Sequence, residues 1–263
     1  MKVVLQGISV WGSGLSGWSH AARVLQGQER WEPAPVQLPP ASCLPANERR
    51  RSGPLARLAL AVADEACTHA GVQAADMRGV FASSNGDGAV VDSILSALST
   101  PEGEVSPTQF HNSVHNAPAG YWTIGHGSLA PAVALGCFDW SFAQGLLKAA
   151  AECVVEDAPV LFVAYDLPIP GPIGKVRVSE HSFGCALVLH PHPAPAGLCV
   201  LDVTHDPGRI AHDAPACAGL RQLAYANPAA AGLAVLQQIA SAQAGEVHLA
   251  SQPGSLRVMV QPC

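Results

Sequence analysis

The residues best suited to chemistry lie in the stretch Gly136–Ser141, which reads Gly-Cys-Phe-Asp-Trp-Ser. Cys137 and Asp139 stand here between an apolar run at Ala132–Leu135 and a long apolar segment at Trp140–Val155. A thiol at the amino end of a helix can act as a nucleophile, because the helix dipole lowers its pKa. A carboxylate at the same position can cap the helix or act as a general base. This stretch is therefore the first candidate for a functional site.

Apolar runs and helical patterns alternate along the chain and predict the elements that position this stretch. Buried strands are expected at Val3–Val10, Val80–Ser83, Ala132–Leu135, Val160–Tyr165, His181–Leu189, Leu198–Val203, Val247–Ala250 and Leu256–Val260. Helices are expected at Pro54–Gly71, Asp92–Leu98, Asn112–Ile124, Trp140–Val155 and Ala229–Ala242. Alternation of this kind favours an α/β layered fold with a mainly parallel sheet.

The composition indicates a globular protein with a large buried surface. Hydrophobic residues make up 49% of the 263 residues and charged residues only 13%, so we expect extensive burial against a partner. The net charge is −6, and no basic run is longer than Arg49–Arg51. Nucleic-acid binding is not expected from this charge pattern.

The sequence carries no motif for a metal or a cofactor. None of the eight cysteines forms a CxxC pair, which predicts reduced thiols in a cytoplasmic protein. The closest histidine pair, His190 and His192, has no third ligand nearby in sequence. Gly12–Gly14 and Asn85–Gly88 lack the spacing of phosphate-binding loops. No signal peptide is expected, because Gly7 and Ser9 interrupt the first apolar run.

The segment Ser106–Lys148 resembles the active-site segment of β-ketoacyl synthases, which condense acyl units. Ser106–Pro131 matches their pattern without a gap, and Val80–Gly88 and Ser182–Leu189 resemble the family's glycine-rich turn and the strand that closes its first half. The likeness covers about the first 190 residues. It implies a thiolase-like αβα fold with a near-complete first half at 1–190 and a shortened second half at 191–263. The best candidate boundary is Pro191–Gly197.

The chain departs from that family where its catalysis takes place. The family's nucleophilic cysteine stands eight residues after the proline of a Gly-x-x-Gly-Pro turn, and the corresponding residue after Pro131 is Asp139. The family's two catalytic histidine patterns are absent from this sequence. The residues around His205 and His248 do not match either pattern, so neither can be assigned the role of a catalytic histidine. A shortened copy without nucleophile or histidines resembles the chain-length factor of type II polyketide systems, in particular those that make aryl polyenes.

This resemblance implies a non-catalytic subunit of a heterodimeric β-ketoacyl synthase that shapes the acyl channel. The partner would be a full-length ketosynthase, with an acyl carrier protein docking mainly on that partner, and no cofactor is implied. Asp139 is then expected to cap the helix, although a role as general base or decarboxylation aid stays open. If the turn were shifted by two residues, Cys137 would be the nucleophile of an independent acyltransferase or thioesterase. A plain ligand-binding or structural module is a further alternative.

Two groups of residues are candidates for the acyl channel or the partner interface. Three large aromatic residues lie close together at the turn; these are Phe138, Trp140 and Phe142. Their rings could block this subunit's own pocket or line a channel that enters from a partner, and the alternative is that they fill space in the core. The family places the segment Ser106–Tyr121 beside the partner's acyl tunnel. Candidates for interface or tunnel-end positions are Gln109, Phe110, Ser113, His115, Tyr121 and Trp122. Ordinary helix packing is the alternative for this second group.

Overall fold

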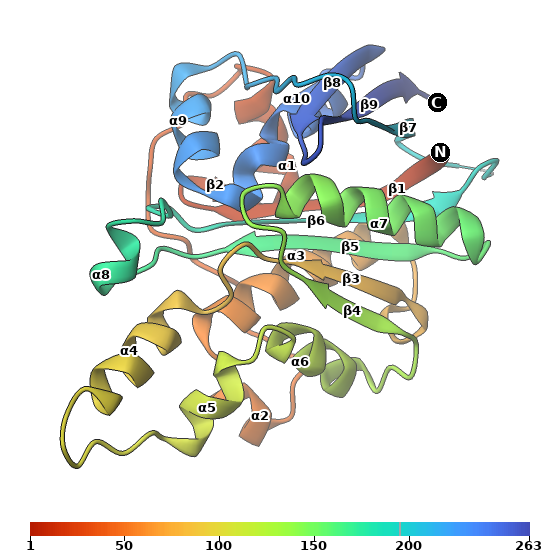
Figure 1. Cartoon of the computed structure of the whole chain (residues 1–263). Coiled ribbons are helices and arrows are strands. Elements are labelled where there is room, and N and C mark those ends of the chain that lie inside the picture. Colours follow the sequence, from red (N-terminus) through yellow and green to blue (C-terminus); the bar gives the residue numbers. More distant parts are fainter. Residues whose placement is uncertain (195) are drawn as a thin grey trace.

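The chain is built around one nine-stranded sheet, seen edge-on across the middle of Figure 1. The computed structural model describes residues 1–194 and 196–263. The strand order is β4-β3-β5-β6-β1-β7-β9-β8, and the short β2 pairs with β1. The strands are β1 (Lys2–Gly12), β2 (Leu15–Ser16), β3 (Arg78–Ala82), β4 (Ala132–Leu135), β5 (Val160–Asp166), β6 (Phe183–Pro191), β7 (Cys199–Asp206), β8 (Gly245–Ala250) and β9 (Ser255–Pro262).

Most strand pairs in this sheet are antiparallel, so the prediction of a mainly parallel sheet was wrong. Only β3 pairs in parallel, with β4 on one side and β5 on the other. The remaining pairs, from β5–β6 through β8–β9, are antiparallel. The connection between β5 and β6 holds only the single-turn helix α8 (Gly171–Gly174), and β8 and β9 are joined by a tight turn. Parallel pairing needs a crossover of about a dozen residues or more, usually with a helix that packs on the sheet; the β8–β9 turn is too short, and the β5–β6 connection holds no such helix.

Helices cover both faces of the sheet and give the three-layer αβα arrangement that the resemblance implies. On one face lie α3 (Pro54–Ala70) and α6 (Ala117–His126), and on the other lie α1 (Gly17–Leu25), α7 (Ser141–Val155) and α10 (Leu233–Ala240). The remaining helices are α2 (Ala46–Arg51), α4 (Gly88–Leu98), α5 (Pro107–Ser113), α9 (Ala218–Ala226) and the short 3-10 turns η1 (Ala74–Asp76) and η2 (Pro228–Gly232).

Alternating side chains of each strand build a separate core on each face. In β5, Leu161 and Val163 pack with α3, whereas Phe162 and Ala164 pack with α7. Close contact between α3 and β1 depends on Gly7, because a Cβ atom there would lie 2.2 Å from the carbonyl oxygen of Ala66. The sheet is thus buried on both sides in its central strands, and this close packing holds the ends of β3 and β5 in place.

The helix expected at Asn112–Ile124 is divided in two. The chain is extended at Val114, where ψ is 137°, and α6 begins after Asn116. Pro118 explains the break, because proline has no N–H to donate and its ring clashes with the carbonyl four residues earlier. The region expected to form one helix at Ala229–Ala242 is η2 followed by α10, and α9 was not predicted.

The last third of the chain extends the same sheet. β1 pairs with β6 along one edge and with β7 along the other, so residues after Pro191 add strands directly to the first part. Residue 195, within the expected boundary Pro191–Gly197, lies outside the described residues. The division into 1–190 and 191–263 stays a prediction. In the described part of the chain, no helix is both long and apolar enough to cross a membrane.

Candidate functional site

The chain turns sharply between β4 and α7 at residues 136–140, called the elbow below. Phe138 stands at its tip with a φ of 56°, a left-handed backbone that is uncommon for an aromatic residue. The Ser141 hydroxyl holds the turn together, because it donates to the carbonyl of Phe138 (2.6 Å) and accepts from the amide of Cys137 (2.9 Å). The local sequence therefore fixes an exposed phenylalanine at the point of the turn.

The carboxyl ends of the three parallel strands meet at this elbow. β4 leads into it, β3 leads into the turn Ser83–Asn85, and β5 ends at Asp166. The Asp166 carboxylate accepts hydrogen bonds from the Ser83 hydroxyl (2.8 Å) and from the amides of Ser84 (3.1 Å) and Asn85 (3.3 Å). In sheets of this kind, ligands bind outside the carboxyl ends of the strands. The elbow thus lies where a binding or catalytic site is expected.

Asp166 is fully buried beneath this turn. Burial raises the pKa of its carboxyl group to about 6, against the opposing effect of the hydrogen bonds from Ser83, Ser84 and Asn85 and of the nearby His115. A second buried polar group, the Asn227 amide, donates to the carbonyls of Asp166 (3.0 Å) and His181 (2.7 Å). Polar side chains from three separate segments therefore hold the floor of the site.

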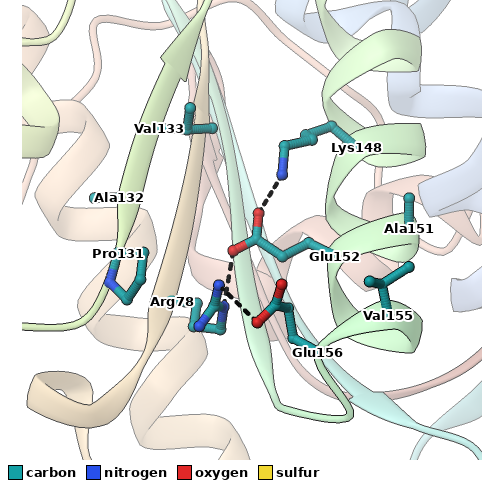
Figure 2. Close-up of a pocket in the computed structure, with 9 residues that line it drawn as sticks. All are labelled: Arg78, Pro131, Ala132, Val133, Lys148, Ala151, Glu152, Val155 and Glu156. Carbon is teal, nitrogen blue, oxygen red and sulfur yellow. Dashed lines mark hydrogen bonds and ion pairs between the residues drawn. The ribbon is translucent and has the colours of Figure 1, made fainter.

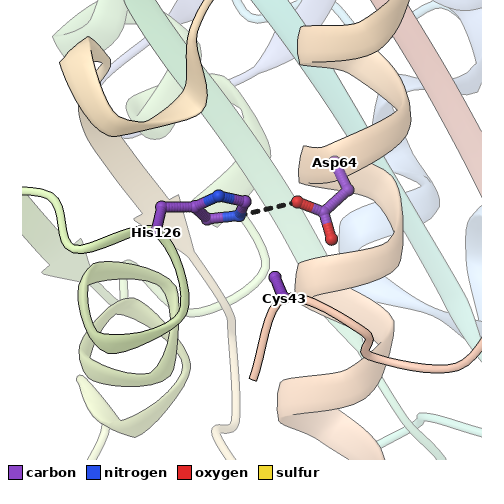
Figure 3. Close-up of side chains that lie close together, drawn as sticks. All are labelled: Cys43, Asp64 and His126. Carbon is purple, nitrogen blue, oxygen red and sulfur yellow. Dashed lines mark ion pairs between the residues drawn. The ribbon is translucent and has the colours of Figure 1, made fainter. Parts of the chain in front are cut away.

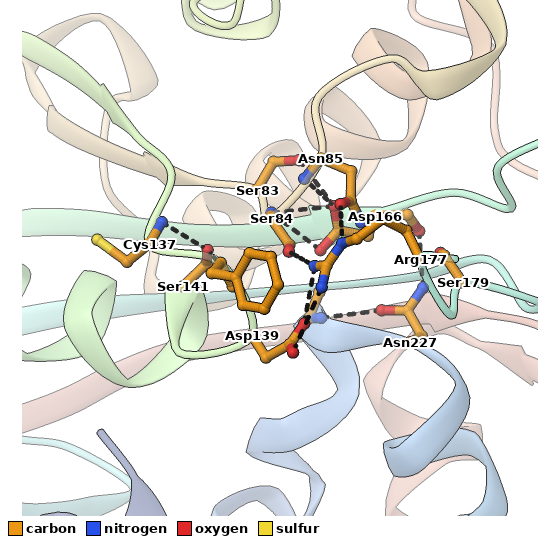
Figure 4. Close-up of polar contacts among 12 residues, drawn as sticks. Ser83, Ser84, Asn85, Cys137, Asp139, Ser141, Asp166, Arg177, Ser179 and Asn227 are labelled. Atoms are coloured by element: carbon orange, nitrogen blue, oxygen red, sulfur yellow. Dashed lines mark hydrogen bonds and ion pairs between the residues drawn. The ribbon is translucent and has the colours of Figure 1, made fainter. Parts of the chain in front are cut away.

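Arg177 closes the elbow from above, as Figure 4 shows. Its guanidinium lies 3.6 Å from the centre of the Phe138 ring and forms an ion pair of 2.8 Å with Asp139. It also donates to the Ser84 hydroxyl (2.9 Å) and to the side-chain carbonyl of Asn85 (3.2 Å). One arginine thus links the elbow to the turn after β3 and occupies the space in front of Phe138.

The expectation that Asp139 caps the following helix was wrong. The N-cap residue of α7 is Trp140, and no side chain caps its amides. The backbone at Phe138 is left-handed, and the Asp139 carboxylate points toward Arg177 instead. The Ser141 hydroxyl accepts the hydrogen bond from the Cys137 amide. Asp139 therefore serves an ion pair across the mouth of the elbow.

The geometry around Cys137 does not match that of an activated nucleophile. An activated thiol needs a general base within hydrogen-bond reach. No imidazole or carboxylate hydrogen-bonds the Cys137 thiol among the residues that the structure describes. The His115 imidazole packs beside Gly136, and its Nε2 atom has no hydrogen-bond partner among the described residues. The elbow can therefore bind a ligand or exclude one sterically, but no described group is positioned to deprotonate the Cys137 thiol.

An open groove of about 380 Å³ lies at the elbow and is lined by Asp139, Trp140 and Arg177. His212 and Tyr225 also line it. Burial lowers the pKa of His212, against the opposing effect of Asp213, and the Nδ1 atom of His212 accepts from the Ala250 amide at 3.2 Å.

His205 and His248 lie away from this groove. His205 Nε2 contacts the carbonyl oxygen of Pro253 at 2.7 Å, and His248 Nε2 contacts Glu246 at 2.8 Å on β8. Neither residue lines the groove. The single imidazole in the groove wall, His212, was not identified from the sequence, because no motif surrounds it.

The structure separates the residues expected at a channel or partner interface into exposed and buried groups. Phe110 is 66% exposed on α5, and Gln109 donates to the Ser93 hydroxyl of α4 at 2.7 Å. Tyr121 and Trp122 are buried in the chain's own core against α3, which is the helix-packing alternative. Three further candidates lie partly exposed between α5, α6 and the elbow; these are Ser113, His115 and Trp140.

Exposed apolar side chains gather around β4, the last strand at one end of the sheet. Among the described residues, β4 pairs with β3 and with no other strand, so its outer edge has free backbone groups. Leu129, just before β4, is 98% exposed, and Val133 within it is 37% exposed. The apolar helix α4 has no buried residue, and neither does α5; both lie on the β4 side of the molecule in Figure 1. This surface, with β4 at its centre, is called the exposed edge below.

A second hollow, at the opposite ends of β3 and β4, is filled by paired charges (Figure 2). Arg78 contacts Glu152 at 2.8 Å and Glu156 at 3.3 Å, and Lys148 also pairs with Glu152. Burial acts to raise the pKa of Glu152, but hydrogen bonds from Lys148 and Arg78 outweigh it and lower the pKa. These charged side chains pair with one another, so the described charges in the hollow already have partners.

Comparisons with known proteins give one family match and several structures of similar fold. The sequence pattern described as β-ketoacyl synthase, N-terminal domain, matches residues 18–251. Among solved structures, the ketosynthase ApeO in complex with its chain length factor ApeC from Xenorhabdus doucetiae matches with a TM-score of 0.72 and 20% identity, over 99% of each chain. The ishigamide ketosynthase/chain length factor matches with a TM-score of 0.69 and 15% identity, over 100% of this chain and 99% of the other.

A β-ketoacyl synthase from Burkholderia phymatum matches with a TM-score of 0.61 and 13% identity, over 88% of this chain and 70% of the other. At these identities the solved structures establish a shared fold. No curated protein sequence matches the chain.

Proposed function

The chain belongs to the family of β-ketoacyl synthase N-terminal domains, and we propose that it is a non-catalytic, chain-length-factor-like subunit of a heterodimeric ketosynthase. The partner is a full-length ketosynthase that supplies the nucleophilic cysteine and both histidines. This chain supplies scaffold and part of the wall of the acyl channel. The pathway is type II polyketide biosynthesis of the aryl polyene kind or a fatty-acid-like process.

The observation that carries this proposal is the state of the elbow. Family catalysis needs a thiolate at this turn, and here Asp139 stands at the matching sequence position, in an ion pair with Arg177. The Phe138 ring and the Arg177 guanidinium fill the space in front of the turn, 3.6 Å apart. An acyl thioester has no nucleophile to meet there. A chain closed in this way can keep the family's scaffold but not its condensation chemistry.

The lengths of the similar chains support the same assignment. Chains from two ketosynthase/chain-length-factor structures match this one over 99% or more of both lengths, so they are nearly equal to it in size. The ketosynthase from Burkholderia phymatum is longer, because the match covers only 70% of it. Chains of about this length and fold are thus present in ketosynthase/chain-length-factor structures.

The exposed edge supplies a surface for the partner. An unpaired strand edge is a ready template for pairing with a second chain, and exposed apolar patches mark association sites. Val133 lies within β4, Leu129 lies just before it, and the exposed Phe110 side chain projects from α5 on the same side of the molecule. We assign the tunnel-end role to Phe110, because one added methylene in a growing acyl chain needs matching free volume.

The test is reconstitution with the partner. Co-expression with a ketosynthase encoded beside it should give a complex of one copy of each chain, measured by native mass spectrometry. After incubation with acyl carrier protein and acyl thioesters, intact-mass analysis should find the acyl adduct on the partner and none on this chain. Phe110→Ala should shift the products of the complex toward longer chains, while Ile210→Ala, at an exposed apolar residue between β7 and α9, should leave product length unchanged.

Two outcomes would overturn the proposal. An acyl adduct on Cys137 of the purified chain alone would establish an independent acyltransferase or thioesterase. A monomer that binds no ketosynthase, with Phe110→Ala having no effect on product length, would indicate a ligand-binding or structural module.

A further inference from the structure

Three potential metal ligands from distant parts of the sequence lie together on the α3 and α6 side of the sheet. Cys43 comes from the loop before α2, Asp64 from α3 and His126 from the end of α6, as Figure 3 shows. One ligand atom of each residue lies within 4.8 Å of the other two. Their separation in sequence explains why no spacing motif reveals them. This group is called the Cys43 cluster below.

The His126 imidazole is positioned but not satisfied within this cluster. Its Nε2 atom lies 2.7 Å from the Asp64 carboxylate, yet this buried nitrogen makes no hydrogen bond of acceptable geometry. The Trp122 ring packs against the imidazole with 4.2 Å between ring centres and restricts its orientation. A buried ring nitrogen without a hydrogen bond is rare in proteins and indicates a missing partner.

The backbone is built to admit the thiol. Gly125 faces Cys43, and a Cβ atom at position 125 would lie 3.2 Å from the cysteine sulfur. Leu44 is buried beside it, which anchors this end of the loop. The Asp64 side chain is about one-third exposed, whereas that of His126 is mostly covered. The cluster therefore has a fixed inner side and an outer side open to solvent.

We propose that Cys43, Asp64 and His126 bind one divalent transition-metal ion, with zinc as the preferred ion and a water molecule as the fourth ligand. One thiolate, one carboxylate and one neutral imidazole are all ligands that Zn²⁺ accepts. Two of them are anionic, so their charges balance that of the ion. Zinc bonds of about 2.0 to 2.3 Å in tetrahedral geometry separate ligand atoms by roughly 3.3 to 3.8 Å, within reach of small side-chain rotations.

Coordination requires the thiolate form of Cys43. Burial and the Asp64 carboxylate raise the pKa of this thiol to about 11, so the metal-free protein holds it protonated. Binding forms the metal–sulfur bond and releases the thiol proton to solvent, with no oxidation or reduction.

The bound ion would fasten a long loop to the body of the protein. Between α1 and α2 the chain runs from Gln26 to Pro45 without a helix or strand. Its described polar anchors lie near its start, where the Trp31 ring donates to the Ser13 carbonyl at 2.9 Å and Gly14 donates to Ala34 at 3.1 Å. A metal at Cys43 would tie the far end to α3 and α6. Clips that close long loops give the largest stabilisation in principle.

The test uses the full-length chain after chelator treatment and desalting. Titration with Co²⁺, followed by the absorption of the thiolate–cobalt bond, should reveal one binding site per chain, and Zn²⁺ should displace the cobalt. Cys43→Ser should abolish the charge-transfer band, and His126→Gln should weaken Co²⁺ binding at least tenfold. Cys217→Ser, which removes an exposed thiol outside the cluster, should bind like the natural chain.

Circular dichroism of each variant guards against a folding defect. If Cys43→Ser does not fold, His126→Gln and Asp64→Asn decide the matter alone. Equal Co²⁺ binding by the natural chain and by folded His126→Gln, or no thiolate–cobalt absorption at all, would overturn the proposal. The inference does not depend on the proposed function, because metal binding and partner binding are measured separately.

Discussion

Asp166 is the residue on which the floor of the elbow depends. Its carboxylate gathers the Ser83 hydroxyl and two backbone amides of the turn after β3, and that turn in turn supplies Ser84 and Asn85 to Arg177. A carboxylate is well suited to accept several donors at once, but burial makes its charge costly. The same residue thus organises the site and carries an electrostatic cost at neutral pH.

This cost predicts a pH dependence of stability. The Asp166 pKa is about 6 in the folded protein and near 3.8 in the unfolded chain, so the folded state binds a proton more readily between these values. Its contribution to stability is complete below pH 4 and is lost as the pH rises through 6. The loss is up to about 3 kcal/mol. Asp166→Asn should remove this part of the pH dependence.

The measurement is urea unfolding of both proteins at several pH values between 4 and 7.5. The difference in the free energy of unfolding, variant minus natural protein, should increase across this range. Asp76→Asn, which alters an exposed carboxylate on η1, is the matched control and should give a constant difference. A constant difference for Asp166→Asn as well would contradict the buried, shifted carboxyl group.

β4 is the element that joins the site to the exterior. It leads directly into the elbow at one end, and its outer edge is unpaired along its whole length. A partner that pairs with this edge would lie close to the turn and to α5. The position of the edge therefore couples assembly to the shape of the acyl channel in the proposed heterodimer.

Charges on this edge should weaken the heterodimer. Leu129→Lys together with Val133→Lys should raise the Kd for the ketosynthase partner about tenfold or more, or roughly 1.4 kcal/mol, because lysine on a strand edge opposes pairing. Surface plasmon resonance would measure the Kd. Ile210→Lys together with Leu198→Lys adds the same two charges at exposed apolar residues on either side of β7 and should have no effect. Equal weakening by both changes would argue against an interface at β4.

Sequence patterns locate the elements around the elbow well. The strand predicted at Ala132–Leu135 coincides with β4, and the helix predicted from Trp140 begins at Ser141. Pro131 and Gly136 delimit the strand clearly, because neither residue favours its interior. The expected order of strand, turn and helix is therefore confirmed.

The contacts made at the elbow could not be predicted in the same way. Arg177 reaches Asp139 from a loop 38 residues later, and the sequence around it is an ordinary proline- and glycine-rich loop. Asp166 is recognisable in the sequence only as a carboxylate at the end of an apolar strand. Nothing in the sequence identifies the groups that donate hydrogen bonds to it. The left-handed backbone at Phe138 follows from the turn geometry, which no residue preference indicates for phenylalanine.

At the scale of the whole molecule, β1 is the strand that unites the fold. It carries β6 on one side and β7 on the other, and α3 packs over it. The sequence indicates two parts, because a proline-rich stretch begins at Pro191. Strand order, however, is set by long-range pairing that no local pattern encodes. The sheet therefore crosses the expected boundary without interruption.

This continuity predicts cooperative unfolding of the full-length chain. Since the two parts share β1, tryptophan fluorescence and far-ultraviolet circular dichroism should give coincident two-state transitions in urea. A variant that stops after Pro191 should fail to fold, because it exposes one edge of β1 and the apolar side chains that α10 and β7 cover. Two separate transitions, or a folded truncated chain, would instead support independent domains at 1–190 and 191–263.

The place of β1 also bears on how the protein is made. This strand leaves the ribosome long before the two long strands that pair with it, which begin at Phe183 and Cys199. Until those strands are made, only the short β2 pairs with β1, so the nascent chain carries an apolar strand with most of both edges vacant, a state prone to misassembly. Chaperone shielding during synthesis is the natural consequence of placing the first strand at the centre of the sheet.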